Sequence, residues 1–204
     1  GEEPVAALED LYRKGNAWVN EDEQNLQEAR KELVKLQNGD KENSFLWQKI
    51  RDLSLGSFEK VYELLDVKFD HAHGESFYRD QVEQVYSALI RNDICTEDQG
   101  ALVVFHPEHK RFSKQPFIIR KSDGASNYAT TDLATIAFRA GEWKAEQIIY
   151  VTDGRQRDHF EQLFMTTRKW FDYEKMVCPT LSHVWFGTIL GEDNKAIKTR
   201  DGQP

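Results

Sequence analysis

The strongest constraint on the fold is an uninterrupted apolar run, Ile148-Ile149-Tyr150-Val151, bounded by turn-forming residues. Consecutive apolar side chains in a strand are typical of a parallel sheet that is buried on both faces. Helical spacing of apolar residues precedes the run at 133–137 and follows it at 160–164, and another strand candidate lies at 184–186. This alternation predicts an α/β fold for the second half of the chain.

The first third of the chain has a different, purely helical periodicity. Apolar residues recur between charged ones at helical spacing, which predicts three helices that each pack on one side. The acidic residues 21–23 favour the start of the second helix, and Asn43 or Ser44 can cap the third. We expect a helical segment over residues 1–66, followed by the α/β region over residues 67–204.

Short strands outside the parallel pair are also predicted. Residues 67–69 alternate between apolar and polar side chains. Apolar residues at 101–105 and 117–119 predict two strands joined by a polar loop. We expect this part, at about residues 99–121, to form a small inserted antiparallel hairpin.

Composition excludes several classes of protein. The 204 residues include 27 Lys and Arg against 35 Asp and Glu, a net charge of −8, whereas a broad nucleic-acid-binding surface needs a basic excess. Hydrophobic residues make up 39% of the chain, which is enough for a folded core. No apolar run reaches the roughly 20 residues that span a bilayer, and the first residues are acidic, unlike a signal peptide. Cys95 and Cys178 lack the spacing of a zinc site. We expect a cytoplasmic protein.

Tyr128 and Asp132 are the first candidate binding residues. They lie four positions apart near a predicted helix start, so both side chains fall on one face. A carboxylate gives charge-assisted hydrogen bonds to a cation, and a phenol can fix its orientation. The alternative is structural, with Asp132 stabilising the helix N-terminus and Tyr128 packing.

A second candidate site, residues 153–159, directly follows the buried strand. Ligands of open α/β sheets bind beyond the carboxyl ends of the strands, and a helix start there favours a nucleotide or substrate. Gln156 and His159 are three positions apart and share a helical face. The alternative is a capped helix with solvated charges.

His71 and His73 form a His-x-His pair, which on a strand would place both imidazoles on one face. No residue nearby has the spacing of a third or fourth metal ligand, so a polar loop is the preferred interpretation. A metal-dependent hydrolase that uses this pair is the less favoured alternative.

Basic residues gather near the end of the chain at Lys198-Thr199-Arg200. Such a cluster on a glycine-flanked loop can stabilise the charge that develops on phosphate groups during their transfer. The alternative is a solvated loop without a ligand.

In their order along the chain, these segments resemble the catalytic domain of class I arginyl-tRNA synthetases. The matching motifs are Gly74-Glu75-Ser76-Phe77-Tyr78, Tyr128-x-x-x-Asp132, Asp153-x-x-Gln156-x-x-His159, His183-Val184-Trp185-Phe186-Gly187 and Lys198-Thr199-Arg200. Their combination is far more specific than any one of them, and the likeness covers nearly the whole chain. It implies a partial Rossmann-like fold, in which residues 67–204 are the second half of the nucleotide-binding catalytic fold.

The resemblance implies the ATP-dependent attachment of arginine to its tRNA through an arginyl-adenylate, with arginine, ATP as its Mg²⁺ complex, and tRNA as partners. It assigns Tyr128 and Asp132 to the arginine side chain, and Gln156 to a further substrate contact. The residues that correspond to the adenine side of the ATP site are His183, Trp185, Phe186 and Gly187. The catalytic loop that steadies the ATP phosphates corresponds to Lys198, Thr199 and Arg200.

Departures from the family pattern limit the expected activity. The 204 residues contain no His-Ile-Gly-His-like signature, and no anticodon-binding helical domain is expected within them after the phosphate loop. In that loop, aligning Lys198-Thr199-Arg200 with the family pattern leaves the usual two lysines out of register. We expect an internal fragment that by itself neither forms the adenylate nor charges tRNA, and whose exposed apolar faces favour self-association. The alternative from another class is a non-catalytic ligand- or partner-binding module of the same fold.

Overall fold

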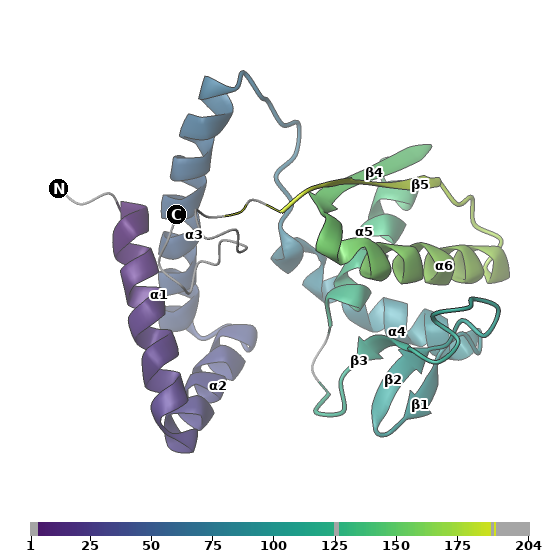
Figure 1. The fold of residues 1–204 in the computed structure, drawn as a ribbon, viewed down its shortest axis with the longest axis horizontal. Helices are drawn as coiled ribbons and strands as arrows, with labels where there is room; N and C mark the ends of the chain where they lie inside the picture. The colour runs from purple at the N-terminus through teal and green to yellow at the C-terminus, as the bar shows by residue number, and fades with distance from the viewer. Residues whose placement is uncertain (1–3, 125–126, 189, 191–204) are drawn as a thin grey trace. The chain divides into compact units, whose positions relative to one another are not determined.

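The computed structural model describes residues 4–124, 127–188 and 190, and it divides into two units. One unit contains the helices of residues 4–71, and the other is the mixed helix and strand region of residues 72–188. Figure 1 shows the helices of the first unit in purple to blue, and the strands of the second in teal to yellow. The change of periodicity along the sequence is therefore visible as a change of architecture.

Three consecutive helices, α1 (Pro4–Glu21), α2 (Glu23–Gln37) and α3 (Lys41–Leu64), form the helical unit. Each of them contacts the other two. The three helices predicted from the apolar spacing are confirmed. However, no residue of α2 or α3 is buried, so the apolar stripes stay largely on the surface of this unit.

Asp40 is the N-cap of α3, and the predicted cap at Asn43 or Ser44 is wrong. The Asp40 carboxylate accepts hydrogen bonds from the backbone N–H groups of Glu42 and Asn43, at 3.1 and 3.0 Å. These N–H groups have no partner within the helix, so an acceptor just before the first turn fixes the start. The Asn43 side chain instead donates to the backbone carbonyl of Glu32 in α2, at 3.0 Å.

The second unit combines 3₁₀ helices, α-helices and strands. In chain order they are η1 (Glu75–Gln81), α4 (Val82–Arg91), β1 (Thr96–Asp98), β2 (Ala101–Val104), β3 (Phe117–Arg120), α5 (Tyr128–Gly141), β4 (Gln147–Asp153), η2 (Gly154–Gln156), α6 (Arg157–Tyr173) and β5 (Thr180–Phe186). Among the described helices of either unit, none is long and apolar enough to cross a membrane.

β4 and β5 form a parallel pair, which confirms the predicted α/β fold. Their register places Tyr150 opposite His183 and Asp153 opposite Phe186, so both strands end at the same edge. The prediction that both faces of this pair are buried is wrong among the described residues: Ile148 is 4% exposed, whereas its neighbour Ile149 is 52% exposed. Figure 1 shows α5 and α6 on the same side of the pair, which leaves the side chains of the other face uncovered by these helices.

The core of the α/β unit lies around α5. This helix contacts α4, α6 and β3, and its Leu133 and Ile136 side chains are completely buried. Leu163 of α6 and Leu89 of α4 are equally buried against them. α5 is therefore held from several sides, and the residues at its start are held with it.

The two strands of the predicted insertion pair antiparallel as β2 and β3, and β1 extends them to a three-stranded sheet in the order β1-β2-β3. β1, which was not predicted, is three residues long and has no buried position. The tight turn between β1 and β2 is formed by Gln99 and Gly100, which both have positive φ. The strand predicted at residues 67–69 is also wrong, since these residues have no regular structure.

Candidate functional site

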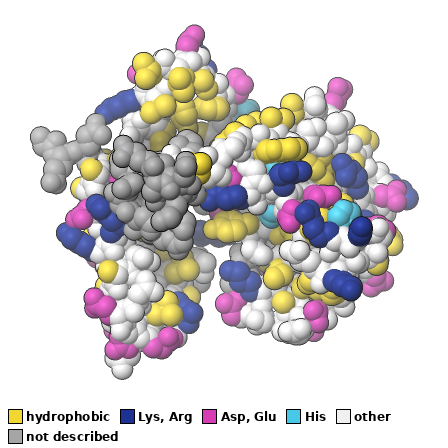
Figure 2. Space-filling view, viewed as in Figure 1, with side chains coloured by type: hydrophobic (Ala, Val, Ile, Leu, Met, Phe, Trp, Pro, Cys, Tyr) yellow, Lys and Arg dark blue, Asp and Glu magenta, His cyan; other side chains and the backbone are white. Residues whose placement is uncertain are grey.

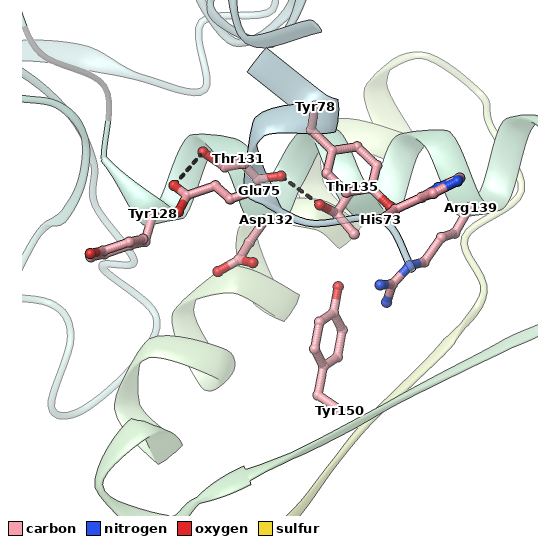
Figure 3. A pocket seen from close by; sticks show the side chains of 9 residues that line it. All are labelled: His73, Glu75, Tyr78, Tyr128, Thr131, Asp132, Thr135, Arg139 and Tyr150. Atoms are coloured by element: carbon pink, nitrogen blue, oxygen red, sulfur yellow. Dashed lines mark hydrogen bonds between the residues drawn. The ribbon is translucent and has the colours of Figure 1, made fainter. Parts of the chain in front are cut away.

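A cavity of about 200 Å³ lies beside the first turns of α5, within the α/β unit (Figure 3). Side chains from η1, from the loop before it, from α5 and from β4 contribute to it. The lining residues are His73, Glu75, Tyr78, Tyr128, Thr131, Asp132, Thr135, Arg139 and Tyr150.

Hydrogen bonds to β3 fix the start of α5. The Asn127 side chain accepts from the backbone N–H of Tyr128 at 2.9 Å and donates to the carbonyl of Ile118 at 3.0 Å. The buried Thr130 hydroxyl donates to the carbonyl of Ile119. Residues three or four positions apart share one face of a helix. Asp132 shares a face of α5 with Tyr128, Thr135 and Arg139, and these residues line the cavity.

Asp132 is the central acidic group of the cavity. Its Oδ2 lies 2.6 Å from Nε2 of His159, which belongs to the first turn of α6. Both side chains are partly buried, with 30% and 27% of their surface exposed. A carboxylate at partial burial interacts more strongly with a cation than one in open water.

Glu75 is a second carboxylate in the same cavity. It accepts a hydrogen bond from the Thr131 hydroxyl at 3.3 Å, and Thr135 donates to the carbonyl of Thr131 at 2.8 Å. Figure 3 shows these contacts along one side of the cavity. The side of the cavity that carries Glu75 and Asp132 therefore suits a positively charged group.

Tyr150 and Arg139 form the other side. Burial raises the pKa of the Tyr150 phenol above its ordinary value, and the nearby Asp132 contributes to the increase, whereas Arg139 opposes it. The Arg139 guanidinium lies 5.6 Å from the Tyr150 ring. Figure 3 shows the Tyr150 hydroxyl directed into the cavity. A neutral phenol thus faces the space next to Asp132 as a hydrogen-bonding group.

The predicted arginine-side residues are only partly brought together. Tyr128 and Asp132 both line the cavity, but Tyr128 is 70% exposed and its phenol points away from Asp132 in Figure 3. Gln156 is exposed and is not among the lining residues. His159, one helical turn further along, makes the contact with Asp132 instead.

Several lining residues were missed by the sequence analysis. Thr135 and Arg139 follow Tyr128 at positions seven and eleven along α5, so extending the helical repeat of Tyr128 and Asp132 would have found them. Tyr150 lies within the apolar run, where alternation along a strand gives no indication of a polar cavity.

A second group of polar residues lies at the carboxyl edge of the parallel pair. The Asp153 carboxylate accepts from the backbone N–H of Arg155 at 2.8 Å and from the Thr188 hydroxyl at 3.1 Å. Its contacts with Arg155 lower the pKa of the Asp153 carboxyl to about 2. At Gly154 an added Cβ would lie 3.3 Å from the Trp185 ring, so the turn passes close to β5.

The predicted adenine-side residues lie at this same edge. His183 Nε2 is 2.8 Å from the Thr152 hydroxyl, and burial, together with nearby Arg157, lowers the pKa of His183. The Arg157 guanidinium lies 4.3 Å from the Trp185 ring centre. Phe186 and Gly187 are exposed at the end of β5. The predicted phosphate-loop residues Lys198, Thr199 and Arg200 lie outside the described residues.

Nothing in the described part of the chain forms a metal site. No group of three or more His, Cys, Asp or Glu side chains within it is arranged to hold a metal ion. His73 is stacked on the ring of Phe77, with 3.9 Å between ring centres. The residues around the His-x-His pair therefore form an aromatic cluster.

The arrangement as a whole defines a class: an α/β ligand-binding fold, with polar groups at the carboxyl edge of its parallel strands and an acidic cavity beside a helix start. The family follows from comparison with known proteins. The family model described as "tRNA synthetases class I (R), catalytic domain" matches residues 1–204. The chain therefore belongs to the arginyl-tRNA synthetase catalytic-domain family, and the resemblance seen in the sequence is confirmed.

Individual relatives agree with this assignment. The arginine–tRNA ligase of Crocosphaera subtropica is 41% identical over 201 residues, which cover 98% of this chain and 34% of that protein. The ligase of Chromobacterium violaceum is 41% identical over 203 residues, or 97% and 35%. The crystal structure of arginyl-tRNA synthetase from Plasmodium falciparum is 32% identical with a TM-score of 0.68, and it covers 81% of this chain and 28% of that one. The chain thus spans about a third of the length of these curated relatives.

Proposed function

We propose that this chain provides the arginine-binding part of an arginine–tRNA ligase, and that Asp132 binds the guanidinium group. The observation that carries the proposal is the carboxylate of Asp132 in a small cavity of a chain that belongs to this family. A cavity of about 200 Å³ suits the end of one side chain rather than a nucleotide. A planar guanidinium donates in two directions at once, which suits a carboxylate.

The neighbours of Asp132 support the same ligand. Glu75 adds a second negative charge on that side of the cavity, and the buried Tyr150 hydroxyl offers a neutral polar contact. Tyr128, at the mouth, is exposed and can turn its ring over a bound substrate. Arg139, on the opposite side, repels a cation and so favours its placement next to Asp132.

ATP, carried as its Mg²⁺ complex, is the proposed second substrate. We place its adenine end near His183 and Trp185, at the carboxyl edge of β4 and β5, where ligands of open α/β sheets bind. Asp153 is negatively charged there at neutral pH, as an ordinary aspartate is, and the contacts with Arg155, which lower its pKa to about 2, preserve that charge in more acidic solution. Such a carboxylate can accept hydrogen bonds from ribose hydroxyls but not bind phosphates.

The proposed reaction has two steps. An oxygen of the arginine carboxylate attacks the α-phosphorus of ATP, and the bond to the leaving pyrophosphate breaks. A ribose hydroxyl of the tRNA then attacks the arginyl carbonyl carbon, loses its proton, and releases AMP. In this scheme the described residues bind and orient the substrates, which is the main contribution that such a reaction needs from the protein.

The experiment is an NMR titration of the 204-residue chain with L-arginine. Replacing Asp132 by Asn keeps its shape but removes its charge, and we expect this to weaken arginine binding by at least about tenfold. Glu161→Gln is the matched control, since Glu161 is a carboxylate that pairs with His109 and Arg111 outside the cavity. Arginine binding by Asp132→Asn as tight as by the unaltered chain would overturn the proposal.

A second measurement separates binding from activation. We expect no arginine-dependent exchange between ATP and pyrophosphate by the 204-residue chain, because the His-Ile-Gly-His-like signature is absent from its sequence. Exchange above background would show that these residues suffice for adenylate formation, and would contradict this part of the proposal. Lysine, tested in parallel at the same concentrations, should bind more weakly because it lacks the planar donor fork.

A further inference from the structure

The contact between Asp132 and His159 has no role in the proposed function so far. It joins the first turns of α5 and α6, and its Nε2 to Oδ2 distance of 2.6 Å is that of a strong hydrogen bond to a charged group. The other carboxylate oxygen of Asp132, Oδ1, has no hydrogen-bond partner among the residues that the structure describes. Asp132 therefore has one oxygen held by the protein and one available for a ligand.

We propose that His159 is a positioning residue, which orients the Asp132 carboxylate for recognition of a guanidinium group. The inference rests on the proposed function and adds a residue to it. In this arrangement the imidazole donates its Nε2 proton to Oδ2, so the Asp132 carboxylate loses rotational freedom while Oδ1 remains available. A carboxylate that is already oriented loses less conformational entropy when it binds a ligand.

The surroundings of His159 hold the ring in place. Its ring centre lies 5.6 Å from that of Phe117 in β3 and 5.2 Å from that of Phe160 in α6, the latter edge to face. Phe117 and Phe160 are 5% and 4% exposed, so both belong to the core. The imidazole is thus fixed by packing on two sides, and it transmits this rigidity to Asp132.

A second histidine and carboxylate pair in the same unit provides an internal comparison. His109 Nε2 lies 3.1 Å from Oε1 of Glu161 in α6, and the His109 side chain is 29% exposed. This value is close to the 27% of His159. However, neither His109 nor Glu161 lines the cavity. The two pairs therefore differ in their position relative to the cavity, and Glu161 additionally pairs with Arg111.

The test begins without arginine. In the 204-residue chain with ¹⁵N-labelled histidine, NMR should show a proton on Nε2 of His159, the nitrogen that contacts Asp132. Asp132→Asn should change the Nε2 signal and leave that of His109 unchanged. A His159 ring that carries its proton on Nδ1 alone would overturn the proposal, whatever the result with arginine.

Arginine titrations of three variants complete the test. His159→Leu removes the donor and should raise the dissociation constant about tenfold, whereas His159→Gln restores a donor at a similar reach and should stay within about threefold of the unaltered chain. His109→Leu should have no effect. A merely structural role would instead make the Leu and Gln variants equally weak, because both disturb the packing.

The outcomes distinguish this inference from the proposed function. If His159→Leu binds arginine as tightly as the unaltered chain while Asp132→Asn does not, the positioning role is overturned and the arginine site stands. Equal weakening by His159→Leu and His159→Gln also overturns the positioning role. If the unaltered chain binds no arginine, the proposed function itself is overturned, while the tautomer still reports on the contact.

Discussion

The helical unit and the α/β unit have apolar residues at equally regular spacings, but the second unit alone buries a large share of them. In α3, Ile50 and Leu53 are 46% and 45% exposed, although they are three positions apart and share one helical face. In α5 and α6, Leu133 and Leu163 are completely buried. The same signal in the sequence therefore has two different structural outcomes.

The difference lies in what each helix packs against. α5 contacts helices and a strand at once, whereas the helices of the first unit contact one another. Figure 2 shows apolar side chains gathered at the end of the helical unit where α3 ends. Phe58, Val61 and Leu64, in the last turns of α3, are at least half exposed. Periodicity thus identifies the apolar face of a helix, but this face is buried only where another layer of secondary structure packs against it. The cavity forms in the unit that has such layers.

The largest expected effect comes from removing equivalent side chains in the two units. Leu163→Ala leaves a cavity in a closed core and should lower the free energy of unfolding by about 3 kcal/mol. Leu33→Ala, in α2, removes a side chain that is 54% exposed, and should cost less than about 1 kcal/mol. Urea denaturation followed by circular dichroism measures both.

Equal losses in the two variants would break the comparison. A cost for Leu33→Ala as large as that for Leu163→Ala would mean that the apolar face of α2 is covered in solution. Measuring both variants at several protein concentrations tests whether a second copy of the chain covers this face. Burial between two copies depends on protein concentration, whereas burial within one chain does not.

A slightly smaller effect is expected from pH, and it should be confined to the α/β unit. His106 is completely buried, with its Nε2 3.1 Å from the Thr166 hydroxyl. Burial, together with the charge of Lys169, lowers the pKa of His106 from 6.5 to about 4. Between these values the unfolded chain binds the proton and the folded chain does not. The contribution of His106 to the free energy of unfolding is therefore fully present above pH 6.5. It falls as the pH drops towards 4, by up to about 3 kcal/mol.

The measurement is the free energy of unfolding between pH 4 and 7, for the unaltered chain and for His106→Gln. The variant should have a smaller slope in this range, because it lacks the titrating group. Residues 4–70 contain no histidine, so their helices should not share this pH dependence. An unchanged slope in His106→Gln would contradict the assignment of the effect to His106.

The parts of the molecule that could be predicted from the sequence are those that depend on local geometry. The four-residue spacing of Tyr128 and Asp132 places both at one cavity because a helix repeats every 3.6 residues. The parallel pair was predicted from the apolar run at residues 148–151. Local geometry, however, gave no indication that the Tyr128 phenol points away from Asp132.

The remaining parts depend on contacts between distant segments. His159 approaches Asp132 across 27 positions, and Tyr150 enters the cavity from β4, which no spacing within α5 predicts. β1 was missed because a three-residue edge strand with exposed side chains has no apolar pattern to detect. Which face of the parallel pair is covered depends on where the helices pack, which the apolar run alone does not determine.

The smallest expected effect comes from the helix caps, and it sharpens the comparison because the lost hydrogen bonds are similar. Asp40→Ala removes the acceptor of two backbone N–H groups at the start of α3, and Asn127→Ala removes the cap of α5. Each should cost about 1 kcal/mol.

The two losses should differ in where they act. The first turn of α3 has no buried side chain to hold it, so its amide hydrogens should exchange faster in Asp40→Ala. In Asn127→Ala, the hydrogen bond from Thr130 to Ile119 and the buried residues of α5 keep the first turn in place. The free energy of global unfolding should therefore fall, while amide exchange near Tyr128 changes little. Hydrogen exchange followed by NMR measures this, with Asn127→Asp, which keeps the acceptor but loses the donor to Ile118, as the control. Fast exchange confined to the first turn of α5 would show that this helix start is held by its cap rather than by the core, as in the helical unit.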